Sequence, residues 1–116
     1  MNNTILDVEL PGIKLFKKGK VRNVFDLGSE LLLVASDRIS AFDSVMPNGI
    51  PDKGAILTQI SLFWFDFTKN IIKNHVIESD VEKYPASLQP YKAMLDKRSI
   101  IGKKAELIPV ECVVRG

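Results

Sequence analysis

Basic residues gather around a glycine near the N-terminus, and residue types of this kind could bind phosphate. The cluster runs through Lys14, Lys17, Lys18, Gly19, Lys20, Val21 and Arg22. A glycine turn lets backbone N–H groups approach a ligand closely, and the neighbouring lysines and arginine add positive charge. The cluster therefore suits a polyphosphate. The alternative, a solvated and lysine-rich sheet edge that discourages aggregation, stays open on residue types alone.

A second group of polar side chains directly follows an apolar run and consists of Asp37, Arg38, Ser40 and Asp43. Side chains at the end of a core strand project where ligands commonly bind. Asp accepts from amines or ribose hydroxyls, Arg pairs with phosphate or carboxylate, and Ser donates to either. The alternative is a cluster that caps backbone groups in a turn.

Four further residues carry less chemistry. Glu111 and Arg115 are four residues apart in an expected strand and so share one face, as an ion pair or in a polar cleft. Cys112 lies in an apolar run, which favours an inert buried thiol over a nucleophile. His75 has no partner at metal-ligand or triad spacing, so we expect a surface or helix-end histidine and no metal site.

The elements that position these residues begin with three short strands. We expect strands at Ile13–Phe16, Val21–Leu27 and Glu30–Ser36, joined by glycine-containing turns into an antiparallel meander. A long loop follows over residues 37–52. Apolar residues then recur at helical spacing and predict a long helix with one buried face, formed by Ile56, Ile60, Phe63, Phe67 and Ile71.

The C-terminal part predicts a second helix and more strands. We expect a β segment at His75–Glu78, a helix near Ala86–Leu95, and a hairpin of strands Arg98–Ala105 and Leu107–Arg115. The sum is an α+β domain, an antiparallel sheet of about five strands with a long helix packed on it.

Composition narrows the class of protein. The chain has 116 residues, 46% of them hydrophobic, which predicts one domain with a core. A net charge of +2 argues against a nucleic-acid binder, and a single cysteine excludes a disulfide framework. No apolar run is long enough to span a membrane, so we expect a cytoplasmic protein. The mean hydropathy of +0.07 is high for a small domain and indicates apolar surface that packs on something outside this chain.

Four segments, in order, resemble motifs of one family, the phosphoribosylaminoimidazole-succinocarboxamide (SAICAR) synthetases. Gly19–Asp26 resembles the family's GKVRDVYD hairpin, with Asn23 in place of the commoner Asp, and Ser36–Asp43 is similar to its SDRISAFD loop. Ile50–Gly54 with the later Phe63–Phe65 resembles its IPxKG…FWF segment, and Leu107–Gly116 resembles the opening of PxExxVRG.

The resemblance implies an ATP-dependent ligase of purine biosynthesis. Such an enzyme joins L-aspartate to 5-amino-1-(5-phosphoribosyl)imidazole-4-carboxylate, an imidazole ribotide, through an acyl phosphate, and releases ADP and phosphate. The resemblance places Gly19, Lys20, Val21 and Arg22 over the ATP phosphates and Lys103, Leu107 and Glu111 near the adenosine. It places Arg115 on the ribotide phosphate, and Asp37, Arg38, Ser40 and Asp43 on the substrate side.

The resemblance also implies that residues 1–116 are one N-terminal ATP-binding lobe, similar to the small lobe of protein kinases. The residues that hold Mg²⁺ are expected in a second lobe, so the chain alone is expected to be inactive. Association between copies of the chain is left open, and neither a nucleic acid nor a membrane is expected as a partner. The alternative to a ligase is a non-catalytic nucleotide-binding or interaction module.

Overall fold

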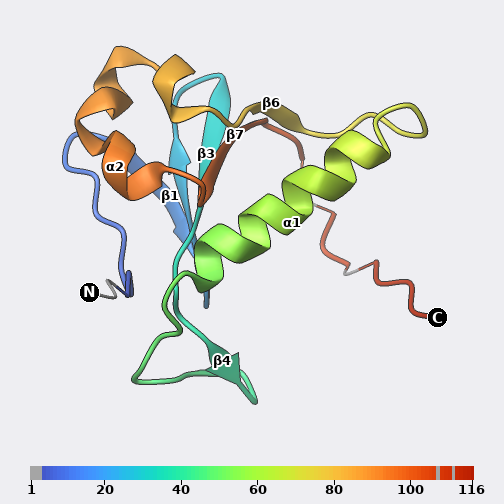
Figure 1. Ribbon diagram of the computed structural model, residues 1–116, viewed down its shortest axis with the longest axis horizontal. Coiled ribbons are helices and arrows are strands. Elements are labelled where there is room, and N and C mark those ends of the chain that lie inside the picture. Colours follow the sequence, from blue (N-terminus) through green and yellow to red (C-terminus); the bar gives the residue numbers. More distant parts are fainter. Residues whose placement is uncertain (1–3, 107, 111) are drawn as a thin grey trace.

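Three successive antiparallel strands begin the sheet. The computed structural model describes residues 4–106, 108–110 and 112–116, and these strands are β1 (Lys14–Lys18), β2 (Arg22–Asp26) and β3 (Glu30–Ala35) (Figure 1). The backbone N–H of Gly19 donates to the carbonyl oxygen of Arg22 at 2.7 Å and closes the first turn. The predicted meander is confirmed.

The complete sheet has five strands in the order β1-β2-β3-β7-β6, and every pair is antiparallel. The two remaining strands are β6 (Val76–Glu78) and β7 (Ser99–Lys103). The fold-class prediction is confirmed, and β7 matches the predicted strand over 98–105. The predicted partner strand over 107–115 is wrong, because the described residues 108–110 and 112–115 form no strand. Since β3 and β6 occupy both sides of β7, no free edge is left for another strand there.

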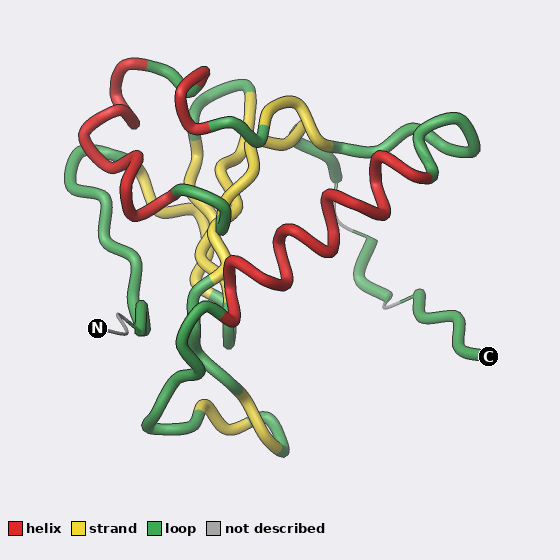
Figure 2. Tube along the Cα trace, viewed as in Figure 1, coloured by secondary structure: helices red, strands yellow, loops and turns green. Residues whose placement is uncertain are grey.

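One face of the sheet carries the core. Side chains alternate along a strand, so Phe25, Leu32 and Val34 point to the same face and are buried. Three short helical elements cover this face, η1 (Val81–Lys83), η2 (Ala86–Tyr91) and α2 (Lys92–Leu95) (Figure 2). The predicted helix over 86–95 is thus a 3₁₀ segment followed by one α-helical turn. Pro90 has no N–H to bond within an α-helix, which explains the break.

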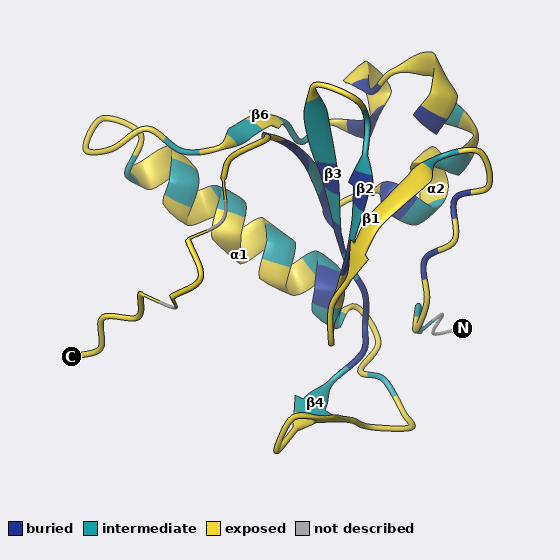
Figure 3. Cartoon of the chain, turned by 180° about the vertical axis from the view of Figure 1, so that it is seen from behind, coloured by how far each residue is buried: buried dark blue, intermediate teal, exposed yellow. Residues whose placement is uncertain are grey.

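Helix α1 (Lys53–Phe67) lies across the other face and packs on β3 and β7 (Figures 1 and 2). The predicted buried stripe is wrong, because Ile60, Phe63 and Phe67 are 49%, 59% and 65% exposed. Much of α1 is coloured as exposed in Figure 3. The helix is apolar on almost every side, so periodicity does not select the face that packs. Trp64, on the same helix, is also exposed. The exposed apolar surface indicated by the mean hydropathy therefore lies largely on α1.

The loop between β3 and α1 contains a small hairpin of two strands, β4 (Ser40–Ala41) and β5 (Ser44–Val45). Phe42 and Asp43 form its turn with φ angles of 50° and 62°, the left-handed geometry that tight two-residue hairpins require. The predicted loop over 37–52 was therefore too simple. In the described part of the chain, no helix has the length and apolar character needed to cross a membrane.

Candidate functional site

The predicted phosphate-binding residues Gly19, Lys20, Val21 and Arg22 lie together in the turn between β1 and β2 and at the start of β2. The turn contributes two backbone donors as well as charge. Among the residues that the structure describes, none accepts a hydrogen bond from the backbone N–H of Lys20 or Val21. The lysine-rich strand β1 beside it is an edge strand, so both interpretations of the basic cluster fit the geometry.

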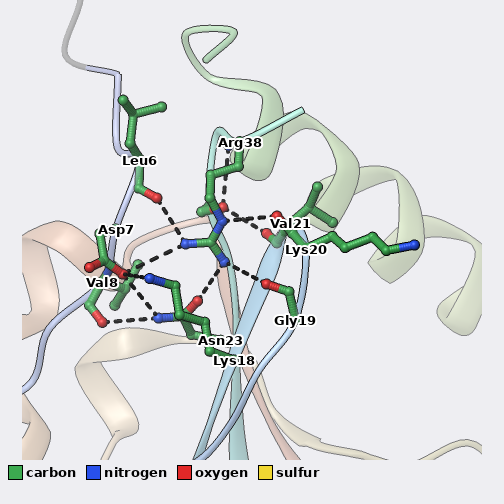
Figure 4. Close-up of polar contacts among 10 residues, drawn as sticks. Leu6, Asp7, Val8, Lys18, Gly19, Lys20, Val21, Asn23 and Arg38 are labelled. Atoms are coloured by element: carbon green, nitrogen blue, oxygen red, sulfur yellow. Dashed lines mark hydrogen bonds and ion pairs between the residues drawn. The ribbon is translucent and has the colours of Figure 1, made fainter. Parts of the chain in front are cut away.

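The guanidinium group of Arg38 is buried beside this turn (Figure 4). Its Nε donates to the carbonyl oxygen of Lys20 at 3.0 Å, and its Nη2 donates to that of Gly19 at 3.2 Å. Nη1 donates to the Leu6 carbonyl oxygen at 2.8 Å, and Nη2 also donates to Oδ1 of Asn23 at 2.6 Å. The hydrogen bonds of this side chain therefore end on the protein itself.

Asp7 supplies the negative charge nearest to Arg38, with Oδ1 at 3.6 Å from Nη1 and at 3.2 Å from Nζ of Lys18. Burial alone would raise the pKa of Asp7. The hydrogen bonds from Lys18, the Val8 backbone and Asn23 outweigh burial and hold this pKa below its ordinary value. The carboxylate is thus charged at neutral pH and balances the buried guanidinium.

The carboxylate of Asp37 contacts the N-terminal segment, the start of α1 and the residue before β7, and so joins three parts of the fold. Its Oδ1 accepts from the backbone N–H of Gly54, at the start of α1, and from Nη1 of Arg98, both at 2.9 Å. Its Oδ2 accepts from the backbone N–H of Ile5 at 2.8 Å and from Nη2 of Arg98 at 3.3 Å. Burial raises the pKa of Asp37, but these bonds outweigh it and the pKa is lowered.

Gly54 lets the helix start approach the sheet so closely. A Cβ atom at this position would lie 2.2 Å from the carbonyl oxygen of Ala35 and 2.7 Å from that of Ser36. The residue before α1, Asp52, makes no side-chain capping bond, so Asp37 caps the helix from a distant point in the sequence.

A pocket of about 160 Å³ lies between α1 and the sheet, next to the basic turn between β1 and β2. Its walls combine apolar side chains with the hydroxyl groups of Ser36, Thr58 and Ser61, and its charged or titratable side chains are basic. The basic side chains are those of Arg22, Lys53, His75 and Arg98, and the apolar lining includes Val21, Leu33, Leu57, Phe65 and Ile100. Burial, with a smaller contribution from the charge of Arg22, lowers the pKa of His75. His75 lies beside Phe65 and is exposed, so the prediction of a surface histidine is confirmed.

The β4–β5 hairpin reaches back to the turn. Oδ1 of Asp43 lies 2.5 Å from Nζ of Lys20, and this hydrogen bond, with the lysine charge, lowers the pKa of Asp43. Ser40 lies at the start of the same hairpin. The structure thus brings the Ser36–Asp43 segment to the basic turn, as functional residues of one site would require.

Other predicted residues lie apart from this group. Lys103 pairs with Glu30, at the other end of β3 from the partner of Arg22, Ala35. Five residues of strand span about 17 Å, so a ligand that contacts both ends must lie along β3. Arg115 is in an exposed C-terminal segment. Leu107 and Glu111 lie outside the described residues, and the proposed pairing of Glu111 with Arg115 stays a prediction.

Cys112 is exposed, so the prediction of a buried thiol is wrong. The apolar run around it forms no strand and packs into no core, as Val113 and Val114 are 61% and 99% exposed. An apolar run predicts burial only where an element is present to cover it.

Comparison with known proteins identifies the family. A profile of the SAICAR synthetase family matches residues 15–116. The chain belongs to this family. The phosphoribosylaminoimidazole-succinocarboxamide synthase of Thermodesulfovibrio yellowstonii is 52% identical over 116 residues, 100% of this chain and 40% of that protein. The enzyme of the same name from Syntrophobacter fumaroxidans is 54% identical over 112 residues, 97% of this chain and 37% of that protein.

A solved structure agrees with this assignment. SAICAR-synthase from Saccharomyces cerevisiae, complexed with SAICAR, matches with a TM-score of 0.82 at 41% identity, over 91% of this chain and 38% of that one. The five-stranded sheet with its helices is therefore a fold that SAICAR synthetases contain. The chain spans about two fifths of the length of the curated relatives that it matches, 40% for the first of them.

Residue patterns missed part of the site. Arg98 immediately precedes β7 and His75 immediately precedes β6, both far along the chain from the basic cluster. The pairing of β3 with β7 and of β7 with β6 brings both residues to the pocket. No local sequence motif predicts this pairing.

Proposed function

We propose that this chain supplies the nucleotide-binding lobe, and part of the substrate site, of a ligase of purine biosynthesis. The ligase would use ATP to join L-aspartate to 5-amino-1-(5-phosphoribosyl)imidazole-4-carboxylate, and would release ADP and phosphate. Membership of the SAICAR synthetase family supports the ligase role. The related SAICAR-synthase from Saccharomyces cerevisiae is complexed with SAICAR, which supports small-molecule substrates for this chain as well.

The observation that carries the nucleotide part is the basic turn. The N–H groups of Lys20 and Val21 have no acceptor among the described residues, and the side chains of Lys20 and Arg22 stand beside them. Backbone donors combined with flanking cations form a site for phosphate oxygens. Lys20 would exchange its exposed partner Asp43 for a phosphate when the nucleotide binds.

Charge neutralisation is the catalytic contribution expected of this turn. A carboxylate oxygen of the imidazole would attack the γ-phosphorus of ATP, and ADP would leave. The amine nitrogen of aspartate would then attack the acyl carbon, lose a proton and displace phosphate. Catalysis of such a transfer consists mainly of positioning and of neutralising phosphate charge.

The remaining site residues keep the roles that the resemblance implies. Ser40, Asp43 and Arg115 would face the substrates, and Lys103, Leu107 and Glu111 would lie near the adenosine. Asp37 and Arg38, both buried, would act on the site through the backbone that they hold.

The residues that would hold Mg²⁺ are expected outside this chain. No group of three His, Cys, Asp or Glu side chains among residues 4–106, 108–110 and 112–116 could hold a metal ion. The ligands of Mg²⁺ would belong to the part of the longer relatives that this chain does not match. An oligomer and a cytoplasmic location stay predictions.

Titration calorimetry with ATP tests the nucleotide proposal. Lys20→Ala should weaken ATP binding by about ten- to a hundredfold, because a hydrogen bond to a charged group contributes about 1.5–3 kcal/mol. The matched control is Lys92→Ala, which removes the same charge from α2, where Lys92 pairs with Glu82. Equal affinities of the two variants would refute the phosphate-binding role of the turn.

The ligase proposal has its own assay. The longer enzyme of which this sequence would form the N-terminal lobe should release ADP only when both aspartate and the imidazole ribotide are present. Residues 1–116 alone should bind ATP without turnover. ATP binding by the longer enzyme without aspartate-dependent ADP release would favour the alternative, a non-catalytic nucleotide-binding module.

A further inference from the structure

We infer that Arg38 is a positioning residue that holds the phosphate-binding turn in its working shape; this inference rests on the proposed nucleotide function. The guanidinium group contacts two consecutive carbonyl oxygens of the turn, those of Gly19 and Lys20, at 3.2 and 3.0 Å (Figure 4). Residues at the end of β3 thus control backbone groups in a turn 18 and 19 residues earlier in the chain.

Peptide geometry converts these two contacts into a consequence for the ligand. In a trans peptide unit, the C=O and N–H bonds point in opposite directions, and the structure contains no cis peptide bond among the described residues. The carbonyls of Gly19 and Lys20 point at Arg38, so the N–H groups of Lys20 and Val21 point away from it. These are the two donors for which no described residue supplies an acceptor. By binding the two carbonyl oxygens, Arg38 therefore directs both N–H donors toward the side of the turn that faces away from it.

Arg38 is itself fixed by groups outside the turn. Leu6 and Asn23 accept from Nη1 and Nη2, at 2.8 and 2.6 Å, and Asp7 lies at 3.6 Å from Nη1. A planar guanidinium group presents its donors in a rigid fork, so these anchors set the direction of the remaining N–H bonds. A lysine at this position would be a single flexible point of charge and could not hold both carbonyl oxygens in fixed directions.

The burial of the Arg38 side chain distinguishes a positioning role from direct contact with the ligand. The side chain of Arg38 is 7% exposed, and its hydrogen bonds end on four protein oxygens. A side chain in this position orders the turn without contacting the ligand. The effect of its replacement should therefore fall on the phosphate part of a nucleotide and leave the nucleoside part alone.

The test compares ADP with adenosine as titrants in calorimetry. In the unaltered protein, ADP should bind more tightly than adenosine because the turn binds phosphate. Arg38→Lys should lower the affinity for ADP about tenfold and leave that for adenosine unchanged, since orientation of two charge-assisted hydrogen bonds is lost. Should Arg38→Lys not fold, Arg38→Gln serves instead, because a neutral amide costs less to bury than a charge.

A matched control separates positioning from stability. Tyr84→Phe removes a buried hydrogen bond to Ser99, 2.9 Å long, on the core face of the sheet away from the turn. It should lower stability and leave the ADP-to-adenosine affinity ratio unchanged. An Arg38 variant that retains the ratio, or that loses ADP and adenosine affinity equally, overturns the positioning role alone. Equal affinities for ADP and adenosine in the unaltered protein would overturn the phosphate-binding proposal and this inference with it.

Discussion

Replacing Asp37 by asparagine removes the charge at the joint between β3, the start of α1 and the N-terminal segment. The carboxylate accepts four hydrogen bonds, two from the guanidinium group of Arg98 and one each from the N–H groups of Ile5 and Gly54. An asparagine side chain has one acceptor oxygen and places an NH₂ group where the other oxygen stood. In Asp37→Asn, an NH₂ donor would therefore face N–H donors that a carboxylate oxygen accepts from in the unaltered protein.

The cost follows from burial. The side chains of Asp37 and Arg98 are 0% and 6% exposed, so water does not screen their interaction. Removing one partner of a buried ion pair leaves the other charge uncompensated and costs about 3–5 kcal/mol. Whole domains are stable by only about 5–15 kcal/mol. We therefore expect Asp37→Asn to lose a large part of the free energy of unfolding.

Urea unfolding followed by far-ultraviolet circular dichroism measures this loss. The control is Asp43→Asn, which removes the same charge from a side chain that is 88% exposed. Exposed pairs contribute at most about 1 kcal/mol. If the free energies of unfolding of the two variants differ by less than about 1 kcal/mol, Asp37 does not stabilise the joint in the way its contacts indicate.

Acidification supplies a second readout of the same residue. Burial raises the pKa of Asp37, but the Arg98 and backbone hydrogen bonds outweigh it, so the folded pKa lies below the ordinary value of 3.8. As the pH falls below about 4, the unfolded chain takes up the proton first and stability is lost. Above that pH the contribution is fully present. The Asp37→Asn variant should lack this part of the acid dependence.

Three other predictions concern single positions. Gly54→Ala should destabilise the fold by about 1–3 kcal/mol in thermal unfolding, because the added Cβ meets two carbonyl oxygens, whereas Ser61→Ala on the exposed part of α1 should not. Burial and the charge of Arg22 lower the pKa of His75, so the free energy of unfolding should fall as the pH drops below about 6.5. Urea unfolding at about pH 7.5 and about pH 5.5 measures this pH dependence, and His75→Gln should remove it. Cys112 is exposed, so a thiol reagent should label it as fast in the native as in the urea-unfolded protein; slow native labelling would contradict its exposure.

Local sequence patterns predicted the first half of the sheet well. Residues 14–35 alternate β-forming segments with glycine turns, and the observed strands follow them closely. Neighbouring antiparallel strands need only short turns, so their pairing is a local property of the chain. The basic turn at Gly19 was predicted for the same reason, because its shape depends on adjacent strands.

The exposed face of α1 was not predictable from the same kind of pattern. Ile56, Ile60 and Phe63 have the spacing of a buried stripe, yet Gly54 and Leu62 lie closer to the sheet. The close approach at Gly54, fixed by Asp37, sets which side of the helix packs. That contact joins residues 17 positions apart, and hydrophobic periodicity carries no information about it.

Residue types left two alternatives open for Asp37 and Arg38, ligand binding or capping of backbone groups. In this fold the two are compatible. The two neighbours point in different directions from the end of β3: Asp37 holds the first turn of α1, and Arg38 holds the turn at Gly19. These are the two sides of the pocket that Arg22 and Lys53 line. A motif with charges at this point can therefore set the distance between the basic turn and a helix without touching a ligand. Replacing Asp37 should mainly change stability, and replacing Arg38 should mainly change the affinity for phosphate, although the two residues are adjacent in the sequence.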